Sequence, residues 1–362
     1  MRKMKTMIII SIVILAVIFL VVSFILYGNY QMGKISNLSY KETLNYVLKD
    51  NSNAVISVGI IKNGNADYTV YGENGTILPK EEHVYEIGSL TKTFTAALVE
   101  KAIVEEKINI NDTVDKYLAM PKGKKYPTIG QLLTHTSRYK GYYFETSMIG
   151  NFFCGRNDFC GINEDRMLAR LSRLSVNGEA SKFEYSNFGY ATLGLILEAV
   201  YGEEYTKLVN HFAQEELGLM NTHISDRKGD LQNYWDWEND DVYLSAGGLT
   251  SNITDMLTYA QLQLSGGDIF TVCHESLAVI NATSVNFAQM DIHMDEIGMG
   301  WIIDNKNEII WHNGGTGGYN CYLGFNQKSD TAVVILSNLK PNYKIPATVM
   351  GIKLLLIYGT KE

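Results

Sequence analysis

Residues 86–95, with the sequence EIGSLTKTFT, place a serine between a strand-like segment and the first turn of a helix. Small and apolar side chains recur at helical spacing from Ser89 to about residue 105. Serine is a poor nucleophile at neutral pH and needs a base within hydrogen-bond reach. Positions i and i+3 share one face of a helix, so Lys92 can provide that base to Ser89 once burial lowers the pKa of its amine.

The Ser-x-x-Lys pattern alone is weak, because it occurs twice more in the chain. Residues 137–140 and 225–228 have the same spacing, but they lie among glycines, tyrosines and charged residues that are typical of loops. Only Ser89 follows a strand signal and begins a helix. The context therefore selects Ser89 as the candidate nucleophile and Lys92 as its base.

Two further short patterns follow Ser89 along the chain. Residues 185–187 (YSN) precede a helical segment, and residues 312–314 (HNG) open a glycine-rich turn that leads to a strand. Residues 27–29 (YGN) also have the Tyr-x-Asn form, but they lie before Ser89, at the end of an apolar segment. Order along the chain therefore selects residues 185–187 over residues 27–29 as the candidate Tyr-x-Asn pattern.

The three ordered patterns resemble those of the serine β-lactamases and penicillin-binding proteins, which are Ser-x-x-Lys, Tyr-x-Asn and a basic residue-x-Gly on a strand. Other segments are similar to the branch of class C β-lactamases and D-alanyl-D-alanine carboxypeptidases, namely residues 86–95 (EIGSLTKTFT), 132–137 (LLTHTS), 245–250 (SAGGLT) and 314–318 (GGTGG). The resemblance spans about residues 40–360. It implies an antiparallel sheet with helices on both faces, an inserted helical lobe, and an active site where the two meet.

The resemblance and the chemistry together imply a catalytic set of Ser89, Lys92 and Tyr185. Lys92 takes the proton of Ser89, and Tyr185 relays a proton to the leaving group and later from water. Taken alone, Tyr185 is equally compatible with a core position. The resemblance requires no metal or cofactor, and the sequence contains neither a C-x-x-C pair nor an H-E-x-x-H motif.

The resemblance also implies a set of substrate-binding residues. Asn187 would orient Lys92 and the substrate amide, although a helix cap is its simpler interpretation. The backbone N–H groups of Ser89 and Gly315 match the oxyanion hole of the family. The remaining substrate contacts are expected at His312, Asn313, Gly314 and Gly315.

The departure from the family pattern that bears most on substrate preference is His312. Most β-lactamases of the family have lysine there, whereas several carboxypeptidases and esterases have histidine. A histidine with an unperturbed pKa of about 6.5 is only roughly a quarter protonated at pH 7, so it would hold a substrate carboxylate less firmly. This favours peptidase or esterase activity over efficient β-lactam hydrolysis. His135, in residues 132–137, is expected to pack and to hydrogen-bond near a helix end.

Strand signals lie at both ends of the chain and helix signals between them, which indicates an α/β fold of the α+β type. Strands are expected at residues 54–61, 67–71, 300–303, 308–312, 319–325 and 331–336, with a tight turn at Asn63-Gly64. Helices are expected at residues 40–49, 89–105, 128–135, 163–171, 188–200, 205–217, 253–264 and 345–357. The economical arrangement is a sheet from about 50–88 and 298–362, with a helical lobe at about 110–290 that contains no strong strand.

The N-terminal residues 7–26 are apolar apart from two serines, a length that spans a bilayer as a helix. Arg2, Lys3 and Lys5 precede this segment, which orients the N-terminus toward the cytoplasm and the rest outside. A cleaved signal peptide is the alternative, but the apolar run is longer than usual and no small-x-small site follows. We expect a cytoplasmic tip, transmembrane anchor (7–27) and linker in residues 1–33, and a catalytic domain in residues 34–362.

Composition excludes one class of partner and leaves other questions open. A net charge of −8 in 362 residues disfavours nucleic acid, whose binding depends on many Lys and Arg contacts.

Cys154 and Cys160 could form a small disulfide loop or be buried free thiols. The aromatic stretches at residues 139–153 and 234–237 could line the substrate cleft or pack within the lobe.

The function that these observations favour is a membrane-anchored, extracytoplasmic serine hydrolase that forms an acyl-enzyme on Ser89. D-amino-acid-containing peptides or esters of the cell envelope are the expected substrates, and β-lactams are possible acylating ligands. A β-lactamase that confers resistance is one alternative. A non-hydrolytic sensor or immunity protein that binds peptidoglycan or an antibiotic is another.

Overall fold

A nine-stranded antiparallel sheet forms the centre of the computed structural model, which describes residues 2–176, 178–340 and 347–359. Its order is β3-β2-β1-β12-β11-β10-β9-β8-β7, so N-terminal and C-terminal strands meet where β1 pairs with β12. The strands are β1 (Ile56–Lys62), β2 (Asn65–Tyr71), β3 (Ile77–Leu78), β7 (Ala278–Val279), β8 (Glu296–Ile297), β9 (Ile302–Asp304), β10 (Ile309–Gly315), β11 (Asn320–Asn326) and β12 (Thr331–Ser337). This confirms the predicted antiparallel sheet assembled from both ends of the chain.

The central strand β12 is buried along its whole length because helices cover both faces of the sheet. Successive side chains of a strand point to opposite faces. Val334 and Leu336 belong to the core under the helical lobe, whereas Val333 and Ile335 belong to the core under α13 (Ala347–Tyr358) and α2 (Tyr40–Leu48). An uninterrupted apolar strand is therefore what this position in the sheet requires.

Two glycines shape the N-terminal part of the sheet, one in a turn and one at a close helix contact. Asn63 and Gly64 both have positive φ, as the predicted tight turn between β1 and β2 requires. Helix α10 (Ile253–Ser265) crosses the sheet at Gly59, where an added Cβ would lie 2.8 Å from a methyl carbon of Leu257. The turn prediction is confirmed, and α10 covers the face of the sheet opposite to α13.

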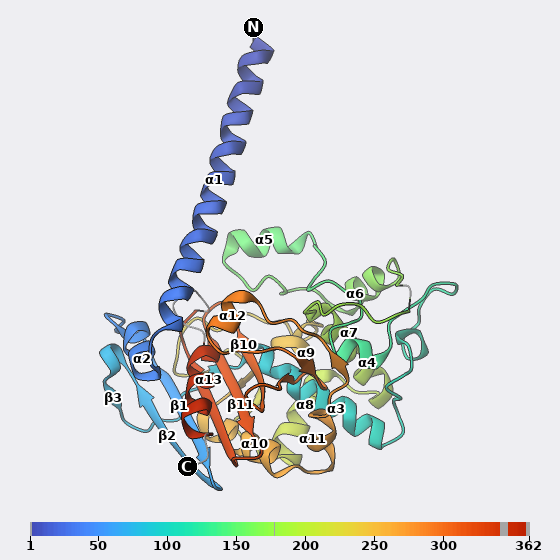
Figure 1. Cartoon of the computed structure of the whole chain (residues 1–362). Coiled ribbons are helices and arrows are strands. Elements are labelled where there is room, and N and C mark those ends of the chain that lie inside the picture. Colours follow the sequence, from blue (N-terminus) through green and yellow to red (C-terminus); the bar gives the residue numbers. More distant parts are fainter. Residues whose placement is uncertain (1, 177, 341–346, 360–362) are drawn as a thin grey trace.

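The helical lobe lies between the two strand groups in sequence and covers the α10 face of the sheet (Figure 1). Its helices are α3 (Thr91–Val104), α4 (Ile129–Leu133), α5 (Ser147–Cys154), α6 (Glu164–Leu171), α7 (Asn187–Tyr201), α8 (Tyr205–His211), α9 (Leu244–Gly247), α11 (Asp268–Cys273) and α12 (Val285–Gln289). Short 3-10 turns are η1 (Glu73–Gly75), η2 (Gly88–Leu90) and η3 (Val114–Lys116), and α8 continues as a π-helical turn, η4 (Phe212–Glu216).

The lobe contains no long strand, as expected, but three short ones lie within residues 110–290. A separate three-stranded sheet joins β4 (Tyr85–Glu86), β6 (Leu249–Ser251) and β5 (His223–Ile224), and β7 extends the large sheet. These strands are two or three residues long, too short for an alternating pattern to be visible in the sequence. Consequently β4, which was expected in the large sheet, instead supports the turn that follows it.

Several predicted boundaries also change, among them those next to Ser89 and His312. The helix expected from Ser89 begins at Thr91, because the 3-10 turn η2 precedes it. The residues expected to form a glycine-rich turn at 312–315 lie within β10 itself, and the turn follows at 316–319. The predicted closing helix includes residues 345 and 346, which lie outside the described residues, and α13 begins at Ala347.

The N-terminal helix α1 (Arg2–Ser36) projects away from the rest of the molecule (Figure 1). Its segment Ile10–Ser36 is long and apolar enough to cross a membrane, with a mean hydropathy of 3.1 in its most apolar window. The expected linker is therefore helical through Ser36. Lys353 on α13 donates to the carbonyl oxygens of Ile35 and Leu38, which holds the C-terminal end of α1 against the domain.

Candidate active site

Ser89 lies in the turn η2, where two stretches of backbone approach each other without side chains between them. Gly88 has a φ of +51°, and an added Cβ there would lie 2.6 Å from the nitrogen of Gly315. An added Cβ on Gly314 would lie 1.9 Å from the carbonyl oxygen of Ile87. Glycine is therefore required on both sides, and β10 lies directly against the turn that presents Ser89.

Lys92 is the buried partner of Ser89. Its Nζ lies 3.0 Å from Ser89 Oγ and donates to the carbonyl oxygen of Ala246 on α9, at 2.6 Å. Lys92 is fully buried, and this burial lowers the pKa of its amine well below the ordinary value. A neutral amine has a lone pair with which to accept the hydroxyl proton, so the geometry suits a general base.

Tyr185 completes the predicted trio at the start of α7. Lys92 Nζ lies 4.9 Å from the centre of the Tyr185 ring. Although 37% of the residue's surface is exposed, protein around its phenol group raises the pKa by desolvation, and contact with the Ser89 hydroxyl partly offsets this shift. The structure thus brings Ser89, Lys92 and Tyr185 together as the sequence predicted, with Tyr185 protonated at neutral pH.

His135 holds the Tyr185 segment in place. Its backbone adopts a φ of +56°, and its Nδ1 accepts a hydrogen bond from the backbone N–H of Ser186 at 3.0 Å. The His135 carbonyl accepts from the N–H of Glu184 at 2.9 Å, and its ring lies 4.5 Å from the ring of Tyr185. These contacts agree with the predicted packing and hydrogen-bonding role.

His312 is buried and uncharged, which corrects its predicted partial charge. The residue is 2% exposed, and its Nδ1 lies 2.6 Å from the carbonyl oxygen of Asn313, to which it donates. Burial, followed by the charge of Lys92, lowers the pKa of His312 to about 3, against a smaller opposing effect of the Asn313 hydrogen bond. The reference pKa of histidine does not apply because this side chain lies inside the protein.

The two asparagines predicted to bind substrate differ in their positions. Asn187 lines the cleft beside Ser89, but the amine of Lys92 bonds to Ala246 rather than to Asn187. The Asn313 amide donates to the Thr348 hydroxyl on α13 at 2.8 Å, on the other face of β10. Alternation along the strand therefore directs the Asn313 amide away from the cleft, and the predicted substrate contact at Asn313 stays a prediction for its backbone alone.

The cleft beside Ser89 is narrow and largely aromatic. It encloses about 40 Å³ and includes Gly315, whose backbone N–H was predicted to join that of Ser89 in an oxyanion hole. Its remaining walls come from distant parts of the chain: Phe159, Asn187, Trp235, Trp237, Tyr243, Ala246 and Gly247. Of the two aromatic stretches that the sequence left unassigned, residues 234–237 therefore contribute to the cleft, whereas the cleft lining includes none of residues 139–153.

Glu86 is a buried carboxyl residue of the site to which the sequence assigns no role. Its carboxylate accepts hydrogen bonds from the Trp235 backbone N–H and the Thr316 hydroxyl, both at 2.6 Å. Burial raises the pKa of Glu86 to about 7, although these hydrogen bonds act in the opposite direction. Its place in EIGS, three residues before the nucleophile, was the available signal, but its partners are not apparent from the sequence.

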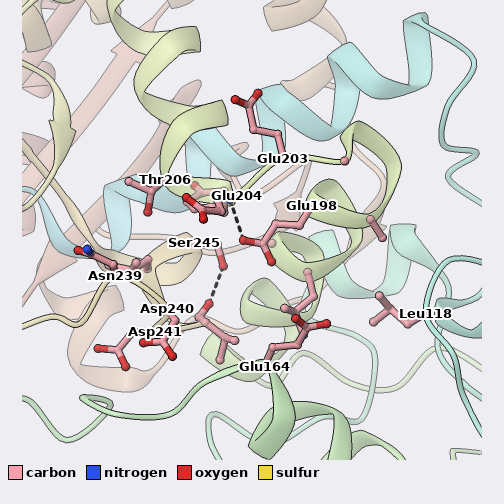
Figure 2. A pocket seen from close by; sticks show the side chains of 17 residues that line it. Leu118, Glu164, Glu198, Glu203, Glu204, Thr206, Asn239, Asp240, Asp241 and Ser245 are labelled. Atoms are coloured by element: carbon pink, nitrogen blue, oxygen red, sulfur yellow. Dashed lines mark hydrogen bonds between the residues drawn. The ribbon is translucent and has the colours of Figure 1, made fainter.

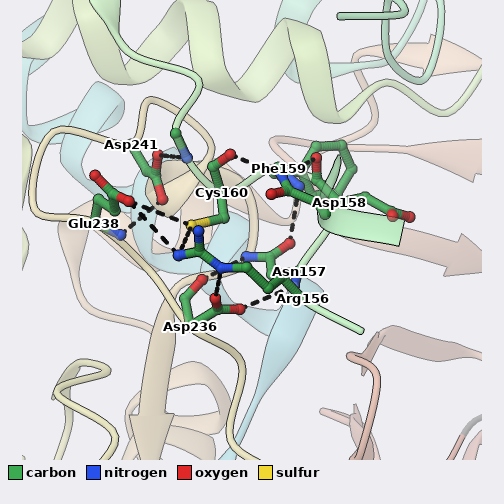
Figure 3. A network of polar contacts seen from close by, with 10 residues as sticks. Arg156, Asn157, Asp158, Phe159, Cys160, Asp236, Glu238 and Asp241 are labelled. Atoms are coloured by element: carbon green, nitrogen blue, oxygen red, sulfur yellow. Dashed lines mark hydrogen bonds and ion pairs between the residues drawn. The ribbon is translucent and has the colours of Figure 1, made fainter. Parts of the chain in front are cut away.

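A network of polar and charged side chains joins residues 156–160 to residues 236–241 (Figure 3). Arg156 pairs with Asp236, and Asp236 also accepts from the backbone N–H of Asn157 at 2.9 Å. Cys160 lies in the same network, where burial raises the pKa of its thiol to about 11. Cys160 and the exposed Cys154 are both free, so the disulfide alternative is wrong.

A larger pocket, of about 550 Å³, lies apart from this cleft (Figure 2). Its lining is acidic and includes Glu164, Glu198, Glu203, Glu204, Asp240 and Asp241. Size alone would favour it as a ligand site, but it contains none of Ser89, Lys92 and Tyr185. Within the described residues, no group of three or more His, Cys, Asp or Glu side chains is placed to hold a metal ion.

A serine at the start of a helix, a buried lysine one turn later and a tyrosine from a helical lobe define a class of protein, the serine acyl-transfer proteins of β-lactamase-like fold. The family model for Beta-lactamase matches residues 47–348 of this chain. The chain therefore belongs to the Beta-lactamase family.

Relatives and solved structures agree with this assignment. The chain is 24% identical over 321 residues to Protein flp of Staphylococcus aureus (strain MRSA252), covering 79% of this chain and 60% of that protein. It is 26% identical over 238 residues to a β-lactamase of Providencia stuartii, covering 61% of this chain and 58% of that protein. The chain thus spans about 60% of the length of these relatives.

Two solved structures share the fold. A β-lactamase/D-alanine carboxypeptidase from Yersinia pestis superposes with a TM-score of 0.71 at 18% identity, covering 91% of this chain and 98% of that chain. An octameric penicillin-binding protein homologue from Pyrococcus abyssi gives a TM-score of 0.68 at 21% identity, covering 86% and 74%. At these identities the likeness establishes the fold alone.

Proposed function

We propose that this chain is a membrane-anchored, extracytoplasmic serine hydrolase that forms an acyl-enzyme on Ser89. The observation that supports this most strongly is the 3.0 Å separation between Ser89 Oγ and the Nζ of Lys92, a lysine that is fully buried. Lys92 accepts the hydroxyl proton while Ser89 Oγ bonds to the substrate carbonyl carbon. The backbone N–H groups of Ser89 and Gly315 stabilise the negative charge that develops on the carbonyl oxygen.

Tyr185 handles the proton of the leaving group. Its protonated phenol gives a proton to the departing nitrogen or oxygen as the bond to the acyl carbon breaks, and Lys92 supplies the replacement proton. In the second half of the reaction a water molecule attacks the acyl-enzyme and gives up its proton along the same path. The products are a free acid and regenerated Ser89.

The substrates that we propose are D-amino-acid-containing peptides or esters of the cell envelope. The narrow cleft beside Ser89 favours a small acyl group such as D-alanyl over a bulky one. Because the pKa of His312 is low, its ring is uncharged at neutral pH and the cleft lacks one positive charge that would bind a carboxylate. We therefore expect esters to be better substrates than carboxylate-ended peptides and β-lactams. One structural neighbour, SurE, is described with D-Leu, a D-amino acid.

The proposed arrangement in the cell follows the sequence prediction. Residues 1–33 would form the cytoplasmic tip, anchor and linker, and residues 34–362 the extracytoplasmic catalytic domain. The exposed apolar side chains of α1 are consistent with lipid contact, since the most apolar window of the helix has none of its residues buried by the protein. We propose no cofactor.

A substrate panel tests the enzymatic proposal. Purified full-length chain in detergent is given D-alanyl esters, D-Ala-D-Ala peptides, D-amino-acid amides and nitrocefin. We expect turnover of an ester or a peptide that Ser89→Ala abolishes. Ser225→Ala is the matched control, because Ser225 belongs to another Ser-x-x-Lys match and does not line the cleft. Turnover that survives in Ser89→Ala would contradict the proposal.

A β-lactamase is the second candidate, favoured by the similarity to the Providencia stuartii enzyme. Rapid turnover of nitrocefin with little activity on esters would establish it in place of the first. The binding alternative, a sensor or immunity protein, predicts that Ser89→Ala keeps full cellular function. Because these outcomes differ, one panel and one variant separate all three.

A further inference from the structure

An apolar surface surrounds helix α5 on the outside of the helical lobe. Phe152 and Phe153 expose 73% and 81% of their surfaces, and Ile149 exposes 50%. Together with the exposed Tyr142 and Phe144 they form what we call the α5 surface, which lines a groove of about 300 Å³. The helix itself has no charged residue. Contiguous exposed aromatic side chains on this scale indicate an interaction surface.

The exposure of these residues does not come from a loosely attached helix. Met148 and Asn151 of α5 are buried, and the Asn151 amide donates to the carbonyl oxygens of Asp158 and Cys160. The ion pair between Arg156 and Asp236 binds the segment that follows α5 to the loop that contains Asp236 (Figure 3). The helix is therefore fixed to the domain with its aromatic face turned outward.

The position of α5 relative to α1 identifies the partner. In Figure 1, α5 lies at the end of the domain from which α1 leaves, beyond the main body, with its axis across that of α1. The end of α1 is held by Lys353, so the direction of α1 is set by contacts with the domain. A bilayer crossed by α1 would consequently extend across the side of the domain that α5 occupies.

We propose that the α5 surface docks on the leaflet of the bilayer from which α1 emerges, with Phe152 and Phe153 inserted among the lipid acyl chains. An uncharged helix with aromatic side chains on one face suits the interface between headgroups and acyl chains. Phe159 belongs both to the α5 groove and to the wall of the Ser89 cleft. Docking therefore brings the mouth of the cleft close to the membrane surface. This inference rests on the proposed membrane anchor.

Cys154, the last residue of α5, provides a direct test because it is exposed while Cys160, Cys273 and Cys321 are buried. The full-length chain is labelled at Cys154 with an environment-sensitive fluorophore and reconstituted into vesicles of phosphatidylcholine and phosphatidylglycerol. We expect blue-shifted emission and several-fold quenching by lipids that have a quencher on the acyl chain. The double variant Phe152→Ser, Phe153→Ser should lose most of the shift and the quenching.

A label on the far side of the domain is the matched control. Val104 ends α3, which Figure 1 draws at the end of the domain away from α1, and it is 63% exposed. Val104→Cys in a Cys154→Ser background should show neither shift nor quenching. Flotation of the vesicles tests the anchor separately, and ester turnover in detergent by the double variant tests the catalytic site separately.

Three results would overturn the docking. Vesicles that float with the protein while the Cys154 label stays unquenched would leave the anchor intact and remove the α5 contact. A shift that depends on protein concentration and not on lipid quenchers would identify a second copy of the chain as the partner. Failure of the chain to float would overturn the anchor and the docking together, while ester turnover in detergent would still stand.

Discussion

At the scale of single residues, the site depends on burial that changes the acid–base state of its side chains. Lys92 is fully buried, and its altered pKa makes it an available base, whereas the same burial keeps Tyr185 protonated and His312 uncharged. A protonated acid and a deprotonated base therefore coexist within a few ångströms of Ser89. Pairs of groups whose surroundings shift their pKa values in opposite senses are typical of catalytic sites.

Replacement of Lys92 should remove acylation. General-base assistance contributes about 10²- to 10⁴-fold, so Lys92→Ala should slow covalent labelling of Ser89 by an activated ester or a fluorescent penicillin by that factor. Lys101→Ala is the matched control, since Lys101 lies on the same helix and pairs with Glu216 away from the cleft. Labelling by Lys92→Ala at a rate close to that of the wild type would show that another group takes the proton.

Replacement of His312 tests whether charge at this position binds the substrate. With a pKa of about 3, His312 stays neutral from pH 5 to pH 8, so the KM for a D-Ala-D-Ala peptide should show no rise attributable to its titration. His312→Gln, which has no ionisable group, should leave the shape of that pH profile unchanged. If instead KM rises with pH in the wild type and the rise disappears in the variant, an imidazolium binds the carboxylate.

At the scale of secondary-structure elements, the sequence predicted the helices and strands that have a regular hydrophobic pattern. It missed the short strands that form only because distant segments pair. The central strands have continuous apolar runs, and α3, α7 and α10 have long helical patterns, so their existence followed from the residues. The short strands β4, β5 and β6 lack any such pattern and exist because β6 pairs with both of its neighbours. Helix α5 exposes its aromatic residues instead of burying them, which no amphipathic rule would have predicted.

The candidate site shows the same division. Ser89 and Lys92 were identified because side-chain chemistry at a fixed spacing is visible in a sequence, and Tyr185 because its Tyr-x-Asn pattern resembles that of the family. The carbonyl of Ala246, which holds Lys92, was not, because every residue has a carbonyl and only the fold selects one. The pKa of His312 depends on burial, and the direction of the Asn313 amide depends on which face of β10 it occupies, so both required the structure.

The contact between β10 and the Ser89 turn depends on Gly314 having no side chain. Because a Cβ there would lie 1.9 Å from the Ile87 carbonyl oxygen, Gly314→Ala must move the strand or the turn. We expect a loss of about 1–3 kcal/mol in the free energy of unfolding, as overpacking typically causes. Acylation should fall about 10²-fold, since a displacement of about 1 Å can have that effect on a reaction.

Chemical unfolding and the rate of covalent labelling of Ser89 measure the two effects of Gly314→Ala. The matched control is Gly150→Ala, because Gly150 lies on exposed α5 and an added Cβ there meets no atom within 4 Å. That control should keep the wild-type labelling rate and lose no stability, because alanine favours a helix over glycine by about 0.5–1 kcal/mol. An unchanged labelling rate in Gly314→Ala would mean that the contact between β10 and the turn is not needed for catalysis.

At the scale of the whole molecule, hydrogen bonds join three segments that are distant in sequence and that lie beside the cleft. Glu86, before the nucleophile, holds the loop that contains Trp235 and the β10–β11 turn that contains Thr316. The same loop is bound through Asp236 to Arg156, next to α5. A contact chain thus connects the nucleophile, the aromatic wall and the surface proposed to meet the membrane.

The stability of this junction should depend on pH through Glu86. Burial raises the pKa of this carboxyl from 4.5 to about 7 in the folded protein, so the folded state holds the proton more tightly than the unfolded state. The contribution of Glu86 to stability is therefore fully present below pH 4.5 and is lost as the pH rises through 7. At about 1.4 kcal/mol per pKa unit, the loss amounts to about 3 kcal/mol.

Glu86→Gln removes this titration while keeping the shape of the side chain, and comparison with the wild type cancels the effect of every other titrating group. The variant loses one acceptor, which shifts its stability by an amount that does not depend on pH. We therefore expect the wild type to lose about 3 kcal/mol relative to Glu86→Gln between pH 4.5 and pH 8, measured by urea unfolding of the full chain in detergent. A difference between the two proteins that stays constant over this range would mean that Glu86 has the same pKa in the folded and the unfolded state, and that its burial is compensated by the hydrogen bonds from Trp235 and Thr316.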